Sequence, residues 1–109
     1  MAGLDANSTA AMSFDLAEAG DGGLTVTING ELDITNVDAL EAAVGSALER
    51  HPARLIVELA GLRFADSSAI ALWVRWSTAV HEIELRDVSP ILRRVIGSMG
   101  LADTLNVKP

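Results

Sequence analysis

The stretch Leu55–Ala69, with the sequence LIVELAGLRFADSSA, carries the strongest structural signal in the chain. Its first five residues, Leu55–Leu59, form a nearly continuous apolar run, which is typical of a central strand covered on both faces. Residues 60–65 are expected to form a loop. Asp66-Ser67-Ser68 then opens a helix, because Asp and Ser are preferred residues at helix starts. A buried strand followed by a helix is the repeating unit of an α/β fold.

The segment before this stretch has the pattern of a β-hairpin followed by a helix. Residues 12–17 and 24–29 alternate apolar and polar side chains, which is the period of half-buried strands, and the turn residues Gly20–Gly23 separate them. A capping pattern with Thr35 as the N-cap then predicts a helix that ends before Pro52. This order places an edge hairpin at the N-terminal side of the sheet.

The segment after the central stretch continues the alternation of helix and strand. A strand is expected near residues 83–88, and Ser89-Pro90 is typical of an N-cap and a first helical position. The third helix carries an apolar stripe over residues 91–99, and Gly100 is typical of the residue just past a helix end. A short last strand is expected at residues 105–107.

The order of these elements predicts the fold class. Strand–helix–strand units join parallel strands through right-handed crossovers. We therefore expect an α/β single domain whose mixed, mostly parallel sheet has an N-terminal edge hairpin and about three helices. Residues 1–11 are small and polar with no period, which predicts a flexible N-terminal tail, and residues 12–109 are expected to form the domain.

Length, charge and cysteine content exclude several classes of protein. A chain of 109 residues forms one domain, and the absence of cysteine excludes a disulfide scaffold. The net charge is −7, with nine acidic and no basic side chains in residues 1–49, which argues against binding nucleic acid or an anionic membrane. Neither a secretory signal nor a stretch long enough for membrane insertion is visible. We expect a cytoplasmic protein that is a monomer or a weak dimer.

No motif for catalysis, cofactor binding or metal binding is found in the sequence. It has no phosphate-binding glycine loop and no nucleophile elbow, and its two histidines, His51 and His81, lie in no metal-ligand spacing. Asp33 and Asp66 follow strands, as in the acid pocket of a response-regulator receiver. That pocket needs a lysine near the late strands, however, and Lys108 is the only lysine. The chain is therefore expected not to be an enzyme, and to bind neither cofactor nor metal.

The segment Asp66-Ser67-Ser68 allows two interpretations. In the first, these residues only cap the helix, because free backbone N–H groups at a helix start need acceptors. In the second, an exposed serine hydroxyl at the junction accepts a phosphoryl group, which would find N–H donors and the positive end of the helix dipole. The second interpretation keeps the fold intact and changes its outer surface.

The helix that follows is apolar almost all round. One stripe runs through Ile70 and Trp73, and a second, which we interpret as nearly opposite, runs through Leu72 and Trp76. A helix with this pattern is buried on every side or binds a partner. Either Leu72 and Trp76 pack on a neighbouring helix, or they line a docking face. We predict that Leu72 and Trp76 line a docking face.

Taken together, these segments resemble the STAS domain, the fold of bacterial anti-sigma factor antagonists, over about residues 12–107. The matching segments are Gly30–Asp33, Leu55–Leu59, Leu62–Ala69, Ser89–Arg94 and Met99–Leu101. The family usually has Gly after the two serines, where this chain has Ala69.

The resemblance implies a regulatory switch. In such proteins the serine after the Asp is phosphorylated by a partner kinase that is itself an anti-sigma factor. The unphosphorylated antagonist binds that kinase and frees the sigma factor. Carried over, the phosphorylation site is Ser67, and ATP belongs to the partner. Together with the apolar pattern of the helix, the resemblance predicts a partner-binding surface made of Asp33, Asp66, Ser68, Ala69, Leu72 and Trp76.

Two other functions stay open with the same fold. A STAS domain can be the accessory subunit that binds the ATPase of a lipid transporter, where the loop serine serves contact more than switching. It can also bind a small ligand in the same groove. A neighbouring kinase gene would favour the switch, and a neighbouring ATPase or permease gene would favour the transporter subunit.

Overall fold

The computed structural model describes residues 11–108, so the expected tail, residues 1–11, lies outside the described residues except for Ala11. The hairpin and the three helices follow the expected order. Along the chain the elements are β1 (Met12–Glu18), β2 (Gly23–Leu32), α1 (Val37–Leu48), β3 (Arg54–Glu58), β4 (Leu62–Ala65), α2 (Ser67–Ala79), β5 (Glu82–Arg86) and α3 (Pro90–Ser98).

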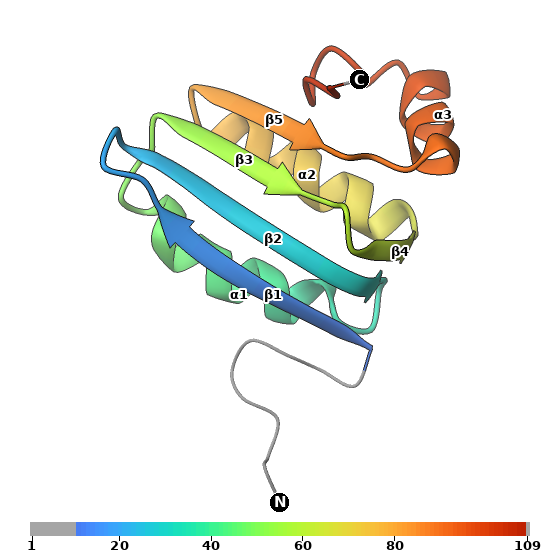
Figure 1. The fold of residues 1–109 in the computed structure, drawn as a ribbon, viewed down its shortest axis with the longest axis horizontal. Helices are drawn as coiled ribbons and strands as arrows, with labels where there is room; N and C mark the ends of the chain where they lie inside the picture. The colour runs from blue at the N-terminus through green and yellow to red at the C-terminus, as the bar shows by residue number, and fades with distance from the viewer. Residues whose placement is uncertain (1–10, 109) are drawn as a thin grey trace, which may run out of the picture.

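The strands form one mixed sheet in the order β1-β2-β3-β5, and β4 pairs with the far end of β2. β1 and β2 are antiparallel, whereas the pairs β2–β3, β2–β4 and β3–β5 are parallel. Figure 1 shows α1 and α2 side by side behind this sheet, while α3 lies beyond the end of β5. The expected last strand is reduced to one bridge between Leu85 and Val107. The predicted fold class is confirmed.

The core lies between the sheet and the helices α1 and α2. Val26 of β2 and Val57 of β3 are fully buried there, in one cluster with Leu40 of α1 and Trp73 of α2. β3 is buried over its three central residues, as its apolar run predicts. This packing fixes the position of α2, and therefore the place at which its first turn leaves the sheet.

The structure corrects the loop expected over residues 60–65, because the last four of these residues form β4. The first half of β2 pairs with β3 and its last residues pair with β4, with a bulge between Gly30 and Glu31. A strand of four residues is barely long enough to show a periodic pattern. The pairing sets Ala65 beside Leu32, so that the residues following the two strands come together.

Some of the helix ends lie where the sequence predicts them and others do not. Ser89 caps α3 and Gly100, with φ of 74°, follows its end, as expected. The residue that precedes α1 is Asn36 instead of Thr35, and the Thr35 hydroxyl donates a hydrogen bond to Asp33. Within residues 11–108, no helix has both the length and the apolar character needed to span a bilayer.

Substituting Gly30 with Ala is expected to lower the free energy of unfolding by about 1–3 kcal/mol. Gly30 lies at the bulge with φ of 93°, and a Cβ atom there would lie 2.2 Å from the backbone oxygen of Ala11. Gly45→Ala in α1 is the control, because nothing lies within 4 Å of a Cβ at that position and alanine favours a helix. Urea unfolding measures both variants. An unchanged midpoint for Gly30→Ala would count against the bulge geometry.

Candidate functional site

The candidate site lies where the ends of β2 and β4 meet the starts of α1 and α2 (Figure 1), and Asp66 joins its parts. The Oδ2 atom of Asp66 accepts a hydrogen bond from the backbone N–H of Ile34 at 3.2 Å. Its Oδ1 atom accepts one from the backbone N–H of Ser68 at 2.9 Å and another from the Ser68 hydroxyl. Asp66 therefore caps α2 and fastens the loop after β2 to the helix start.

These hydrogen bonds favour the ionised form of Asp66. The Ser68 hydroxyl contributes most to lowering the pKa of the Asp66 carboxyl below its usual value. Partial burial opposes this shift, and the N–H groups of Ile34, Ser68 and Ala69 add to it. A carboxyl whose pKa is lowered by folding stabilises the fold above its unfolded-state pKa of about 3.9. That contribution is lost as the pH falls through the folded-state pKa.

Asp66→Ala is expected to lower the free energy of unfolding at pH 7 by about 1–2 kcal/mol, because it removes a helix cap and the bond to Ile34. The difference from the wild type should shrink as the pH falls from about 4 towards 2, where the wild-type carboxylate becomes protonated. Urea unfolding over this pH range measures the effect. Asp103→Ala, at an exposed aspartate with no side-chain hydrogen bond within residues 11–108, is the control. A difference that is independent of pH would show that ionised Asp66 is not its source.

The structure distinguishes the two serines at the start of α2. Ser68 is half-buried, and its hydroxyl is engaged by Asp66. Ser67 is exposed, is the first residue of the helix, and has a hydroxyl with no hydrogen-bond partner in the part of the chain that the structure describes. Of the two, Ser67 offers the hydroxyl that is free to react.

Asp33 organises the loop after β2. Its Oδ1 atom accepts hydrogen bonds from the backbone N–H of Thr35 at 2.9 Å and from the Thr35 hydroxyl. The side chain of Asn36, which is buried, accepts a hydrogen bond from the Asp33 N–H at 2.9 Å and donates one to the backbone of β2. The loop is thus held by its own side chains. Ile34 at its tip binds Asp66, so the two aspartates that follow strands belong to one site.

Beside Ser67 the surface forms an apolar groove of about 270 Å³, bounded by β4, the first turn of α2 and α3. Its polar side chains include Arg63, Asp66 and Ser67. Four of its apolar residues are exposed, namely Phe64 (52%), Ile91 (80%), Val95 (41%) and Met99 (51%). Apolar side chains gathered on the surface in this way are typical of an interaction site.

The structure contradicts the expectation that Leu72 and Trp76 line a docking face. Only 0% and 2% of these residues is exposed, and Ala69 is fully buried as well. At about 100° per residue, the two apolar stripes of α2 lie about a third of a turn apart instead of opposite each other. One wide face, packed against the sheet and α1, therefore buries both stripes. The outward face of α2 runs through Ser67, Ala71, Arg75 and Thr78.

The exposed apolar residues of the groove were not expected from the sequence. The stripe on α3 predicts one buried face, but only Leu92 and Ile96 are buried, and the remaining apolar residues of the stripe point into the groove. Phe64 lies in the segment expected to be a loop. The width of the stripe is the signal that would have found the groove. Five apolar positions within residues 91–99 exceed what one packing face of a short helix needs.

The two histidines lie away from this site. His51 and His81 line an open pocket that follows the C-terminal ends of α1 and α2, whereas Ser67 lies at the opposite end of α2. Within residues 11–108, no three His, Asp or Glu side chains gather in a way that could hold a metal ion. The site around Ser67 is built of hydrogen-bonding and apolar groups suited to contact with another molecule.

Comparisons with known proteins match residues 15–107 to a family model described as Mlab, STAS domain. A search of curated proteins found no significant relative. Among solved structures, an anti-sigma factor antagonist from Mycobacterium paratuberculosis is similar with a TM-score of 0.81 and 24% sequence identity. The similarity covers 90% of this chain and 86% of that chain.

Two structures of SpoIIAA are also similar. The anti-sigma factor antagonist SpoIIAA in its unphosphorylated form has a TM-score of 0.76 and 22% identity over 89% of both chains. SpoIIAA in the phosphorylated form, described as a Bacillus cell fate determinant, has a TM-score of 0.71 and 22% identity over 89% of this chain and 92% of that chain. At these identities the similarity establishes a shared fold.

Proposed function

The chain belongs to the STAS domain family, and on that premise we propose that it is an anti-sigma factor antagonist. In its unphosphorylated form it binds an anti-sigma factor that is also a serine kinase, and this binding frees the sigma factor. Phosphorylation of Ser67 by the same kinase ends the binding. The observation that carries the proposal is the exposed, unbonded hydroxyl of Ser67 beside an apolar groove.

The modification is a phosphoryl transfer in which this chain supplies only the acceptor. The Ser67 oxygen bonds to the γ-phosphorus of ATP held by the kinase, the bond from that phosphorus to the oxygen of ADP breaks, and the hydroxyl proton passes to a base on the kinase. Asp66 accepts no hydrogen bond from the Ser67 hydroxyl within the described residues, because its carboxylate oxygens bind Ile34 and Ser68. The kinase therefore supplies both the base and the nucleotide.

The start of α2 can hold a phosphate without unfolding. A phosphate on Ser67 lies at the positive end of the helix dipole, close to the N–H groups of the first turn. Arg63 on β4 lines the same groove and forms no ion pair within residues 11–108, so its guanidinium can offset part of the charge. The fold is expected to survive the modification, while the surface gains about −1.5 to −2 charges.

Phosphate mapping by mass spectrometry tests the proposal. The purified chain is incubated with ATP and each candidate serine kinase from its own organism. We expect one phosphate on Ser67, and none on the Ser67→Ala variant. Ser68→Ala is the matched control, because it removes the neighbouring hydroxyl and leaves the proposed acceptor in place. Phosphate on Ser68 or Thr35, with Ser67 unmodified, would overturn the assignment.

The accessory-subunit alternative gives a different result in the same experiment. A chain that binds the ATPase of a transporter through Ser67 needs no kinase. Stable binding to such an ATPase, without phosphorylation by any candidate kinase, would replace the switch by this alternative. Binding that is weakened by Ser67→Ala would then show that the hydroxyl serves contact.

A further inference from the structure

Three arginines of the chain form no ion pair within the described residues, and one of them, Arg63, lines the groove. Four of the seven arginines are paired with carboxylates, in the bridges Arg50–Glu18 (2.8 Å), Arg54–Asp21 (3.0 Å), Arg75–Glu41 (3.0 Å) and Arg86–Glu58 (3.7 Å). Arg63, Arg93 and Arg94 have no such partner within residues 11–108. They lack an ion pair although the chain has fifteen acidic side chains and a net charge of −7. Of these three, Arg63 lies in the groove, together with the Asp66 carboxylate, and Arg94 lies on the same helix as Ile91.

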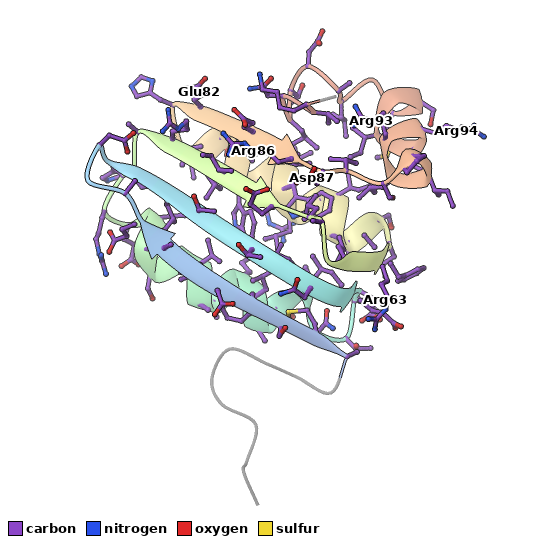
Figure 2. The ribbon with its side chains drawn as sticks, in the orientation of Figure 1. Arg63, Glu82, Arg86, Asp87, Arg93 and Arg94 are labelled. Atoms are coloured by element: carbon purple, nitrogen blue, oxygen red, sulfur yellow. The ribbon has the colours of Figure 1, made fainter. Side chains whose placement is uncertain are left out.

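Two of these arginines are placed to meet a partner that covers the groove. Arg63 lines it from β4. Arg94 is exposed on α3 and follows Ile91 by three residues, which places it next to that side chain along the helix surface. Figure 2 shows Arg63 beside the end of β4 and Arg94 projecting outward from α3. Arg93 points to the other side, where it donates a hydrogen bond to the backbone oxygen of Lys108 at 2.8 Å.

We propose that this groove receives an amphipathic, acidic segment of the protein partner. Apolar side chains of that segment fill the space between Phe64 and Ile91, and its carboxylates pair with Arg63 and Arg94. The inference rests on the proposed function in one respect, because the segment belongs to the partner that also contacts Ser67. It adds the chemistry by which that partner is recognised.

The exposed walls of the groove favour a protein segment over a small ligand. Sites that bind a small molecule usually enclose most of its surface. Four apolar side chains of this groove remain between 41% and 80% exposed, so the groove is an open surface that a segment of another protein can cover. Arg63 in the groove and Arg94 next to Ile91 suit a segment that has an apolar stripe with acidic residues on either side. The acidic first half of the chain, with nine acidic side chains in residues 1–49, repels such a segment and so directs it to the groove.

The proposal connects partner recognition with the switch. A phosphate on Ser67 would share the groove with Arg63, since both residues line it. It then competes with the carboxylates of the partner for the same guanidinium and repels them. The two effects act in the same direction, so the partner loses an attraction and meets a repulsion at one place.

Two synthetic peptides test the chemistry without a natural partner. Both are helical peptides of about 18 residues with the same Leu and Phe stripe, one with Glu and the other with Lys on either side of it. Each is titrated to millimolar concentration into the ¹⁵N-labelled full chain and followed by NMR. We expect the Glu peptide to shift the amide signals of Phe64, Ile91 and Val95, and to bind at least tenfold more tightly than the Lys peptide. Equal or tighter binding of the Lys peptide, or shifts confined to other residues, would overturn the proposal.

Two further results would also count against a protein segment. The first is the absence of any shift with the Glu peptide. The second is binding to phosphatidylglycerol vesicles that removes the signals of the groove residues, because it would assign the positive surface to a membrane.

Charge-reversal variants test the same surface with the kinase that phosphorylates Ser67. Arg63→Glu combined with Arg94→Glu should weaken binding about tenfold and reduce its dependence on salt, because two ion pairs at the rim of an interface are lost. Arg50→Glu is the control, since it reverses one charge in an exposed ion pair with Glu18, away from the groove. Its affinity should stay within twofold of the wild type.

The outcomes separate this inference from the proposed function. If the double variant binds as tightly as the wild type, and phosphorylation still controls the complex, the acidic segment is wrong and the switch stands. If no kinase binds or modifies the wild type, the switch is wrong, and the peptide titration still decides what the groove receives.

Discussion

Phosphorylation of Ser67 is expected to weaken binding to the anti-sigma factor by about two to three orders of magnitude. The free hydroxyl is neutral, and its phosphate would lie next to the Asp66 carboxylate and beside the groove. In an interface formed with the neutral serine, the phosphate loses its water and finds no partner on the anti-sigma factor. An unpaired charge buried in this way costs about 3–5 kcal/mol.

Calorimetric titration of the partner into three forms of the chain measures this effect. Ser67→Ala should bind like the wild type and escape control by the kinase. Ser67→Asp should bind less tightly, though by a smaller factor than the phosphorylated chain, because it adds one charge instead of about two. Ser67→Asn is the control for side-chain shape, because asparagine has about the size of aspartate and carries no charge. If Ser67→Asp binds as tightly as Ser67→Ala, charge at this position is not the switch.

Truncation of either tryptophan of α2 is expected to lower the free energy of unfolding by about 3–5 kcal/mol. Trp73 and Trp76 are 0% and 2% exposed and belong to the same core cluster, so each Ala variant leaves a large cavity. Whole domains have free energies of unfolding of about 5–15 kcal/mol, so these losses are a large part of the total. The two variants should therefore be destabilised to a similar extent.

Thermal and urea unfolding of both Ala variants provides the measurement. Trp73→Phe and Trp76→Phe are included because they keep most of the ring volume and should fold even if the Ala variants do not. Thr78→Ala on the outward face of α2 is the control and should change stability by about 0.5 kcal/mol or less. A Trp76→Ala variant that is as stable as the wild type but no longer binds its partner would show that Trp76 does belong to a docking face.

Much of the fold could be predicted from the sequence because its signals are local. The alternating strands around Gly20–Gly23 specify the hairpin, and the apolar run Leu55–Leu59 specifies the central strand. Ser89 and Gly100 mark the two ends of α3 through the backbone geometry that each residue favours. Asp66 as the cap of α2 follows from the same chemistry.

The rest depends on contacts between distant parts of the chain. β4 forms because its backbone pairs with the end of β2. Its four residues are too few to show the alternating pattern by which a strand is predicted from the sequence. Burial of Trp76 depends on how α2 is placed between the sheet and α1, which the helix alone does not specify. The groove is missed because its walls, β4 and α3, are separated by about 25 residues. The hydrogen bond from Ile34 to Asp66, which spans 32 residues, has no signal in either segment.

If Ser67 is phosphorylated as proposed, the hydrogen bond between Ser68 and Asp66 affects how a population of these molecules responds to the kinase. It engages one of the two hydroxyls at the start of α2 and leaves the other free, so each molecule would carry either no phosphate or one phosphate there. A protein with one phosphorylation site cannot have a response threshold that depends on the accumulation of several phosphates. The fraction of unmodified molecules would then vary smoothly with the rates at which the phosphate is added and removed, as long as neither step is saturated. A sharp, all-or-none output must come from the relative amounts of antagonist, kinase and sigma factor.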